Sequence, residues 1–469
     1  MGFNGRRTRG LTAVALAGLV ASPGSVAHAQ DGGAGESSGL NIVRDTEIEE
    51  ILHQEMDPIF SAANMDPKRV ALYVVSDNDV VNAQTGSGYN MVVFSGLLLK
   101  TKTPNELEGV IAHETGHMAR GDVARMGAES SRGVTGPMII GLGLGILAAL
   151  AGAPEAAAGM IYSGNYFGQL NGLAFTRDIE ARADQAAITY LEKAGYSGRG
   201  IVDFFNFFRY EETFSDAKKY PFWFSHPLSD ERIEALTERA KAQPHYNTPD
   251  TPESIAAYEV MKAKLKAYTQ RPFQTYIDYP ESDMSFPARY ARAIADFQEL
   301  ETGKGLKEID ALIAERPYDP YLYEVKGQSL MDVSRAAEGE AALRQAVQLK
   351  PDAPLLRILL AQDLLAENDP KKIPDAIANL NRSLIGEPDS PIAWQYLSEA
   401  YDASGNDGMA RLATAEQDFH LGQVRDARAF AMRARTLLKH GTPDWQRATD
   451  IVLSSNPSAD DLRYMNGSN

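Results

Sequence analysis

The sequence predicts an α+β chain, with a mainly helical first domain that contains a small antiparallel sheet and an all-α repeat array behind it. Two short runs rich in β-branched and aromatic residues, 70–75 and 91–94, lie among longer stretches whose apolar residues follow a helical spacing. A proline-bounded pattern then recurs in the last third of the chain. The 469 residues suffice for two or three domains, and 44% hydrophobic with 23% charged residues is ordinary for a globular protein.

Residues 1–29 have the features of a secretory signal peptide. Arginines within residues 6–9 precede an apolar run at 11–20, and small residues flank His28 at the expected cleavage site. A membrane anchor is the alternative, and it fits poorly because the apolar run is too short to span a bilayer. We therefore expect export, with the periplasm of a Gram-negative bacterium as the destination.

The chain contains no cysteine and carries a formal net charge of -17 at pH 7. The missing cysteines exclude disulfides, thiolate nucleophiles, cysteine zinc fingers and acylation at an N-terminal cysteine. The negative charge argues against a nucleic-acid partner, since phosphate backbones are bound by clustered Lys and Arg. An exported protein of this composition must be held together by its hydrophobic cores.

The first domain is expected to begin with a helix over residues 44–64, where the apolar side chains recur at helical spacing. The two β-like runs follow it. Turn signals at 77–79 and 86–88 separate these runs, which favours a small antiparallel sheet.

Three further helices are predicted in this domain. One covers residues 105–120, because Thr103 and Glu106 form a capping box ahead of it. Another covers about 176–194 and ends at a glycine, and a third starts at Glu231.

Residues 138–152 form an apolar, glycine-rich run of about fifteen residues. A bilayer-spanning helix needs about 20 apolar residues, so a full span is not expected. A buried or lid-like helix is the favoured interpretation. The alternative is peripheral membrane contact through residues 138–152.

The C-terminal part is repetitive. Three proline-bounded segments open successive helix pairs, at residues 316–320, 350–354 and 387–391. The first spacing of 34 residues is the period of tetratricopeptide repeats, and the second spacing of 37 implies a small insertion near residues 369–372. The third copy carries large side chains at the consensus positions Trp394, Leu397 and Tyr401. A generic helical bundle is the alternative.

These features divide the chain as follows. The signal peptide covers 1–29, the first domain 30–247, a connector 248–286, a tetratricopeptide-like repeat domain 287–455 and a tail 456–469.

Residues 113–117 read His-Glu-Thr-Gly-His. On a helix His113 and His117 lie one turn apart, so both imidazoles leave the same face and can take two corners of a zinc tetrahedron. Glu114 stands beside them, at a position suited to a metal-bound water, whose proton it can accept as general base. A surface histidine pair is the alternative, and it fits poorly because residues 110–112 are apolar. The expected cofactor is Zn²⁺.

A catalytic zinc ion needs a third protein ligand and an open fourth position. No histidine follows the motif at short spacing, so a carboxylate on a later helix is the better candidate. Glu180 and Asp184 are four residues apart and share one face of the predicted helix. We expect Glu180 to bind the metal and Asp184 to hold a ligand histidine through its free N–H. Two solvated helix charges are the alternative.

These motifs resemble those of the HtpX/CAAX-prenyl-protease class of gluzincin metallopeptidases, and most of all its exported, repeat-bearing BepA-type members. The residues that carry the resemblance are Asn82-Ala83, the second β-like run with residues 95–98 after it, residues 113–122 and residues 177–184. The peptidase resemblance covers about residues 45–240, and the repeat resemblance covers about 290–455.

The resemblance implies a zincin-type peptidase domain with zinc bound by His113, His117 and Glu180 and with Glu114 as base. It also draws attention to His226, which lies in a His-Pro loop at 225–232. In relatives this histidine can approach the zinc, which implies either a latch over the open position or a donor to the tetrahedral oxyanion. Arg232 is a weaker candidate for the oxyanion or for support of the ligands.

We therefore expect a zinc metalloendopeptidase that cleaves protein or peptide substrates, and the resemblance implies envelope protein quality control. An extended substrate would add as a strand at the edge near residues 89–95. The repeats offer a concave surface for a client or for the outer-membrane assembly machinery. The rival reading is a periplasmic chaperone or adaptor that acts through its repeats with a latent zinc site. A non-proteolytic zinc hydrolase is less favoured.

Overall fold

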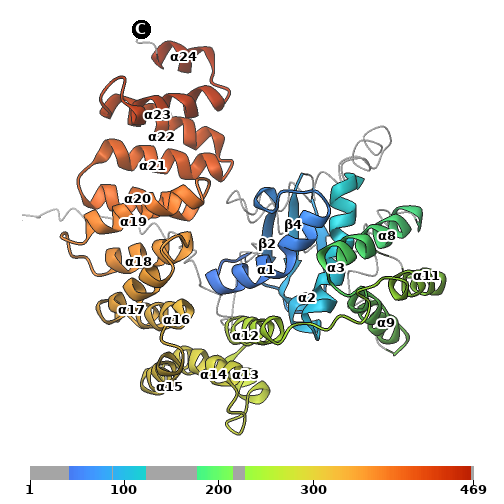
Figure 1. Ribbon diagram of the computed structural model, residues 1–469. Coiled ribbons are helices and arrows are strands. Elements are labelled where there is room, and N and C mark those ends of the chain that lie inside the picture. The colour runs from blue at the N-terminus through green and yellow to red at the C-terminus, as the bar shows by residue number, and fades with distance from the viewer. Residues whose placement is uncertain (1–41, 87, 123–176, 215–225, 227, 466–469) are drawn as a thin grey trace, which may run out of the picture.

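The computed structural model describes residues 42–86, 88–122, 177–214, 226 and 228–465 (Figure 1). The predicted signal peptide and the apolar run at 138–152 lie outside the described residues. Within the described ranges, none of the helices is both long and apolar enough to cross a membrane. Figure 1 shows a body that contains the sheet and, beside it, a column of stacked helices that ends at the C-terminus.

The sheet has four strands in the order β1-β2-β4-β3. Their bounds are β1 (Ile42–Val43), β2 (Ala71–Val75), β3 (Ala83–Thr85) and β4 (Asn90–Phe94). β2 and β4 pair in parallel, from Ala71 opposite Asn90 to Val75 opposite Phe94, while the two outer pairings are antiparallel.

The α+β class is confirmed, but the sheet is mixed rather than antiparallel. The reason is β3, a short strand that the sequence reading missed. β3 and β4 form an antiparallel hairpin, so the chain reverses once more and β4 enters beside β2 in the same direction. The expected substrate edge near residues 89–95 is therefore wrong, because β4 is paired on both sides and β3 is the outer strand.

Four helices of this body lie close to the predicted bounds, namely α1 (Thr46–Ala62), α3 (Pro104–Arg120), α8 (Arg177–Ala194) and α11 (Asp230–Lys241). Two more helices, α2 (Ser95–Lys100) and α9 (Arg199–Phe214), and the 3-10 turn η1 (Pro67–Arg69) were not predicted. The hydroxyl of Thr103 accepts the N–H of Glu106 at 3.2 Å at the start of α3, and Gly121 ends the helix with a left-handed φ of 62°. One hydrophobic core joins the sheet, α1, α3 and α9.

The predicted connector contains α12 (Pro252–Thr269), which is packed on two sides. Tyr258, Met261 and Leu265 belong to the core of the sheet-containing body. Val260 and Ala263 belong to a second core formed with the next helices. This helix therefore ties the two parts of the molecule together.

The column continues from this junction. Its helices are α13 (Pro272–Asp278), α14 (Phe286–Gln298), α15 (Thr302–Glu315), α16 (Pro320–Asp332), α17 (Ala336–Leu349), α18 (Pro354–Ala366), α19 (Ile373–Gly386), α20 (Pro391–Ala403), α21 (Asp407–His420), α22 (Val424–Leu437), α23 (Pro443–Ser454) and α24 (Ala459–Met465). Each of the three proline-bounded segments precedes a helix that begins at its proline, namely Pro320, Pro354 and Pro391.

The expected insertion near 369–372 lies between α18 and α19. It supplies Lys372, whose ammonium group pairs with Glu340 at 2.6 Å and with Glu367 at 2.5 Å. Lys372 therefore holds the start of α19 against the two preceding helices.

Candidate metal centre

Two helices, α3 and α8, bring the predicted ligands together because they pack in close contact. Gly116 stands between the two motif histidines on α3. A Cβ atom at this position would lie 3.0 Å from the carbonyl oxygen of Ala183 and 3.3 Å from the Cβ of Ala186. The glycine thus lets α8 approach the histidine face of α3, which is how Glu180 reaches the motif.

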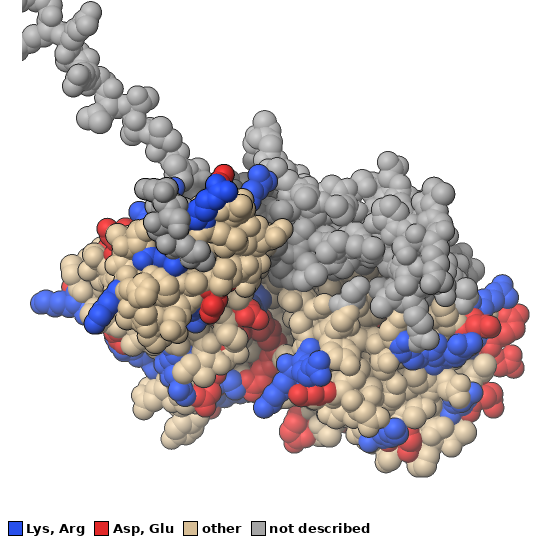
Figure 2. Space-filling view, turned by 90° about the horizontal axis from the view of Figure 1, so that it is seen from above, with Lys and Arg blue, Asp and Glu red and all other residues tan. Residues whose placement is uncertain are grey.

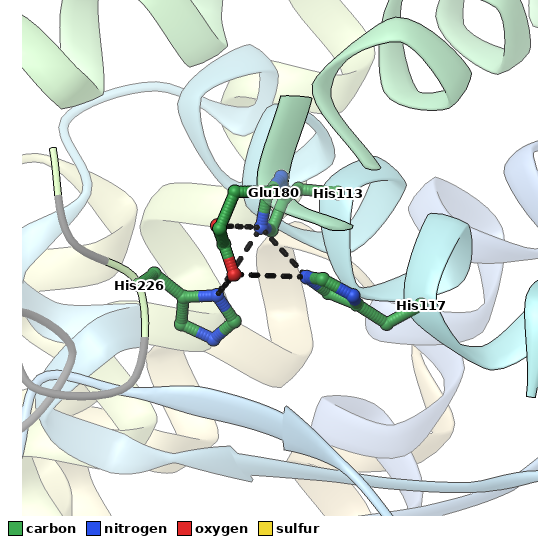
Figure 3. A group of neighbouring side chains, drawn as sticks. All are labelled: His113, His117, Glu180 and His226. Carbon is green, nitrogen blue, oxygen red and sulfur yellow. Dashed lines mark hydrogen bonds and ion pairs between the residues drawn. The ribbon is translucent and has the colours of Figure 1, made fainter. Parts of the chain in front are cut away.

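Four side chains converge on one point (Figure 3). Nε2 of His113 lies 3.1 Å from Nε2 of His117. The Glu180 carboxylate is 3.4 Å from the first of these nitrogens and 3.5 Å from the second. Nδ1 of His226 lies 3.0 Å from Glu180 and 3.3 Å from His113. All four residues are buried, and their ligand atoms lie within 4.8 Å of one another.

These separations fit a tetrahedral zinc ion. With zinc–ligand distances of about 2.0–2.1 Å, the edge of a ligand tetrahedron is about 3.3 Å. Imidazole nitrogens and a carboxylate oxygen are also the ligand types that zinc prefers. His113, His117 and Glu180 would hold the metal, and the nitrogen of His226 lies at the fourth corner.

A ring of charged groups behind the ligands fixes their orientation. Oδ1 of Asp184 lies 2.9 Å from Nδ1 of His113, and Oδ2 of Asp122 lies 3.2 Å from Nδ1 of His117. Each histidine therefore has Nδ1 held by a carboxylate, which leaves Nε2 for the metal. Arg232 donates to Asp184 at 2.6 and 2.8 Å and lies 2.8 Å from Glu180.

The surroundings shift the pKa values of the candidate ligands in different directions. Burial disfavours the imidazolium form of His113, but its bonds to Asp184 and Glu180 outweigh burial and raise the pKa to about 9. For His117 burial prevails over the bond to Asp122, and the pKa is lowered. Burial opposes ionisation of Glu180, yet His226 and His113 hold its pKa well below the usual range. Ionised carboxylates thus face a buried point where positive charge is stabilised.

Glu114 lies beside this group rather than in it. Its carboxylate is buried and Oε1 lies 3.3 Å from Nε2 of His226. It is on the same helix as the two motif histidines, directly after the first of them.

The structure thus brings every predicted site residue into one cluster, namely His113, Glu114, His117, Glu180, Asp184, His226 and Arg232. No role was predicted for Asp122 from the sequence. Its position directly after Gly121 was the available signal, because a left-handed residue turns the chain back toward the last helical turn, where His117 lies.

Comparisons with known proteins agree with this geometry. Residues 45–240 match the model of peptidase family M48. The chain is similar to the beta-barrel assembly-enhancing protease of Yersinia pestis, with 23% identity over 80% of this chain and 76% of the relative. It is similar to a putative beta-barrel assembly-enhancing protease of Vibrio cholerae, with 26% identity over 78% and 75%.

The peptidase part alone is similar to the metalloprotease LoiP of Escherichia coli, at 28% identity over 38% of this chain and 65% of the relative. The resemblance drawn from the motifs is thereby confirmed. The family match and the convergent metal ligands lead to one conclusion: the chain carries a peptidase domain of family M48, of the BepA type, and is a metalloendopeptidase.

Proposed function

We propose that this chain is an exported zinc-dependent endopeptidase that cleaves protein clients during quality control of the bacterial envelope. The observation that carries the proposal is the buried set of His113, His117 and Glu180, whose ligand atoms have the separations of a tetrahedral zinc site. The names of the relatives, which are beta-barrel assembly-enhancing proteases, support outer-membrane proteins as the client class.

The reaction is peptide hydrolysis. When bound, zinc supplies a Lewis acid that lowers the pKa of a coordinated water and polarises the scissile carbonyl. Glu114 accepts the proton of the attacking water and later delivers it to the leaving amine. Asp184 and Asp122 keep the two imidazoles in one tautomer, and Arg232 keeps Glu180 and Asp184 in place.

His226 acts as a latch in this proposal. Its ring lies against Glu180 and Glu114, at the corner that a water or a substrate carbonyl has to take. A substrate can enter only after this ring has moved. The second role left open by the sequence, donation to the oxyanion, would follow that movement.

The bound polypeptide would add as an extended strand to β3, the outer strand that borders α3. Main-chain hydrogen bonds then align the substrate with little dependence on its side chains. This property suits an enzyme that acts on misassembled proteins of varied sequence. The repeats would recruit the client or the outer-membrane assembly machinery.

The experiment is the substitution Glu114→Gln in the full-length secreted chain. We expect cleavage of an unfolded protein such as casein to fall at least about 10³-fold, because the general base is lost, while zinc content stays unchanged. Glu234→Gln, at an exposed position of α11, is the matched control and should retain activity. Equal cleavage by the two variants would refute the proposed catalytic role.

A chaperone or adaptor function through the repeats is the second candidate. The column of helices supports it, since it makes up a large part of the chain and stands beside the peptidase body (Figure 1). Client folding by Glu114→Gln measures this activity apart from proteolysis. Fractionation of cells that express the natural gene tests export, and recovery in the cytoplasm would contradict it.

A further inference from the structure

A second buried cluster of charges lies between the peptidase body and the column. Its centre is Lys264 on α12, whose side chain is 1% exposed. The ammonium group lies 2.8 Å from Asp45 at the N-cap of α1, 3.2 Å from Glu47 in the first turn of α1 and 3.1 Å from Glu324 on α16. We call these four residues the junction cluster.

Further polar groups contact the junction cluster. The hydroxyl of Tyr290, on α14, donates to Glu47 at 3.0 Å. The hydroxyl of Thr46 donates to Glu324 at 2.8 Å, directly across the contact between α1 and α16. Other titratable groups also interact with the cluster, namely Tyr268 on α12, Asp319 ahead of α16, Tyr321 on α16 and Glu49 on α1.

Outside this cluster the contact between α1 and the column is thin. Arg44 pairs with Glu387 at 2.8 Å, and Glu50 pairs with Lys350 and accepts the hydroxyl of Tyr321. A cavity of about 600 Å³ lies on one side of α1 and another of about 450 Å³ on the other.

The larger cavity is lined by five carboxylates, those of Glu47, Glu50, Glu253, Glu315 and Asp319. In the view from above, acidic side chains gather in the hollow between the two bodies (Figure 2). The contact of α16 with α1 itself is therefore made by a few polar groups, while the apolar residues Leu322 and Val325 of α16 pack against α12.

The junction cluster is not electrically balanced. It contains three carboxyl groups and one ammonium group, all within 3.2 Å of the lysine nitrogen. Buried carboxylates without a full complement of cations are strongly disfavoured. We call the arrangement with α16 packed against α1 the docked state and the arrangement with the two helices apart the open state. The docked state is therefore more stable when one of these carboxyl groups carries a proton. Separation of α16 from α1 would return the groups to water, where all three are ionised at neutral pH.

We propose that the junction cluster is a proton-operated lock, which holds the helical column against the peptidase body when protonated and loosens when it loses its proton. The lock goes beyond the proposed peptidase function and does not depend on it. Opening of the lock would change the angle between the column and the peptidase body, in which α1 packs on α3 and α8.

The direction of the pH dependence follows from the carboxyl groups. Burial raises the pKa of Glu47 to about 7, against the attraction of Lys264. Burial likewise raises the pKa of Glu324 to about 6. The docked state therefore binds more protons than the open state between about pH 4.5 and pH 7. Docking strengthens as the pH falls through 7 and weakens as it rises.

Hydrogen exchange of the full-length, zinc-loaded chain tests the lock. We expect the protection of backbone amides in residues 44–50 and 321–325 to increase about tenfold from pH 8 to pH 6, after correction for the intrinsic exchange rate. Amides of α21, which lies away from the junction, should show no such change.

Glu47→Gln imitates the protonated carboxyl group and should give high protection at both pH values. Glu50→Gln is the matched control on the same helix and at the same contact. It should lower protection at both pH values and keep the tenfold pH response, because Glu50 lies outside the junction cluster.

Equal protection of the parent chain at pH 8 and pH 6 would overturn the proposal. An unaltered pH response in Glu47→Gln would do the same. If that variant does not fold, as judged by circular dichroism, Glu324→Gln replaces it under the same criteria.

Discussion

At the scale of single residues, the geometry of the metal centre depends on ion pairs that orient the ligand side chains. Arg232 is the main cation of the ligand network, and it contacts both the third ligand Glu180 and the carboxylate of Asp184 that orients His113. We predict that Arg232→Met lowers zinc affinity by about 10- to 100-fold, because both carboxylates lose their orientation. Competition with a chromogenic chelator measures the affinity. The control Glu114→Gln should bind zinc as the parent does, and an unchanged affinity in Arg232→Met would contradict the network.

His226 offers a second test at this scale. If its ring is a latch, His226→Ala opens the fourth corner, and cleavage of a short peptide should rise several-fold at unchanged zinc content. The opposite result, a loss of about 10²-fold or more in kcat, would assign the residue to oxyanion stabilisation instead. Steady-state kinetics with a fluorogenic peptide separates the two roles.

A third residue, Glu108, makes the stability of the folded protein depend on pH. Glu108 on α3 is buried, and burial raises its pKa to about 9, although its bond to Asn105 acts in the opposite sense. The pKa of Glu108 is higher in the folded than in the unfolded protein, so its protonated form stabilises the fold. This contribution to the free energy of unfolding is complete below about pH 4.5 and is lost as the pH rises toward 9. We predict that Glu108→Gln flattens the fall in urea midpoint between pH 6 and pH 9. An unchanged slope would show that the carboxyl group does not titrate with unfolding.

At the scale of the element, the close contact of α3 and α8 depends on a missing side chain. A Cβ at Gly116 would lie 3.0 Å from the carbonyl oxygen of Ala183, so Gly116→Ala pushes the two ligand helices apart. We expect a loss of about 1–3 kcal/mol in unfolding free energy and reduced zinc content. Gly303→Ala is the matched control, since nothing lies within 4 Å of its Cβ, and it should be neutral or slightly stabilising. Similar urea midpoints and zinc contents for the two variants would refute the packing argument.

At the scale of the whole molecule, the metal joins parts of the chain that are far apart in sequence. The ligand group draws on α3, on α8 and on the segment at His226. A ligand that binds only the folded state stabilises it by mass action. We therefore predict that chelation lowers the unfolding midpoint of the peptidase body by on the order of 10 °C and leaves that of the column unchanged. Differential scanning calorimetry with and without added zinc measures both transitions. Equal shifts in the two would mean that the bodies unfold as one unit.

The sequence alone predicted the features that depend on residues close together in the chain. A helical turn between two histidines, a capping box at Thr103 and Glu106, and a recurring proline-bounded segment each depend on spacing along one stretch of chain. These features predicted the helices, the repeat-like column and the chemical nature of the site. The relation of Glu180 to Asp184 was also readable, because residues four apart on a helix share a face.

Only the tertiary structure determined the features that depend on how distant segments of the chain pack against one another. It set the parallel pairing of β2 with β4 through the hairpin to β3, the approach of α8 across Gly116, and the place of His226 at the fourth corner. It also buried Lys264 among carboxylates from α1 and α16. Spacing along the chain states which side chains share a face, but the face that each one meets, and therefore its pKa and its ligands, is fixed only when distant elements pack and exclude water.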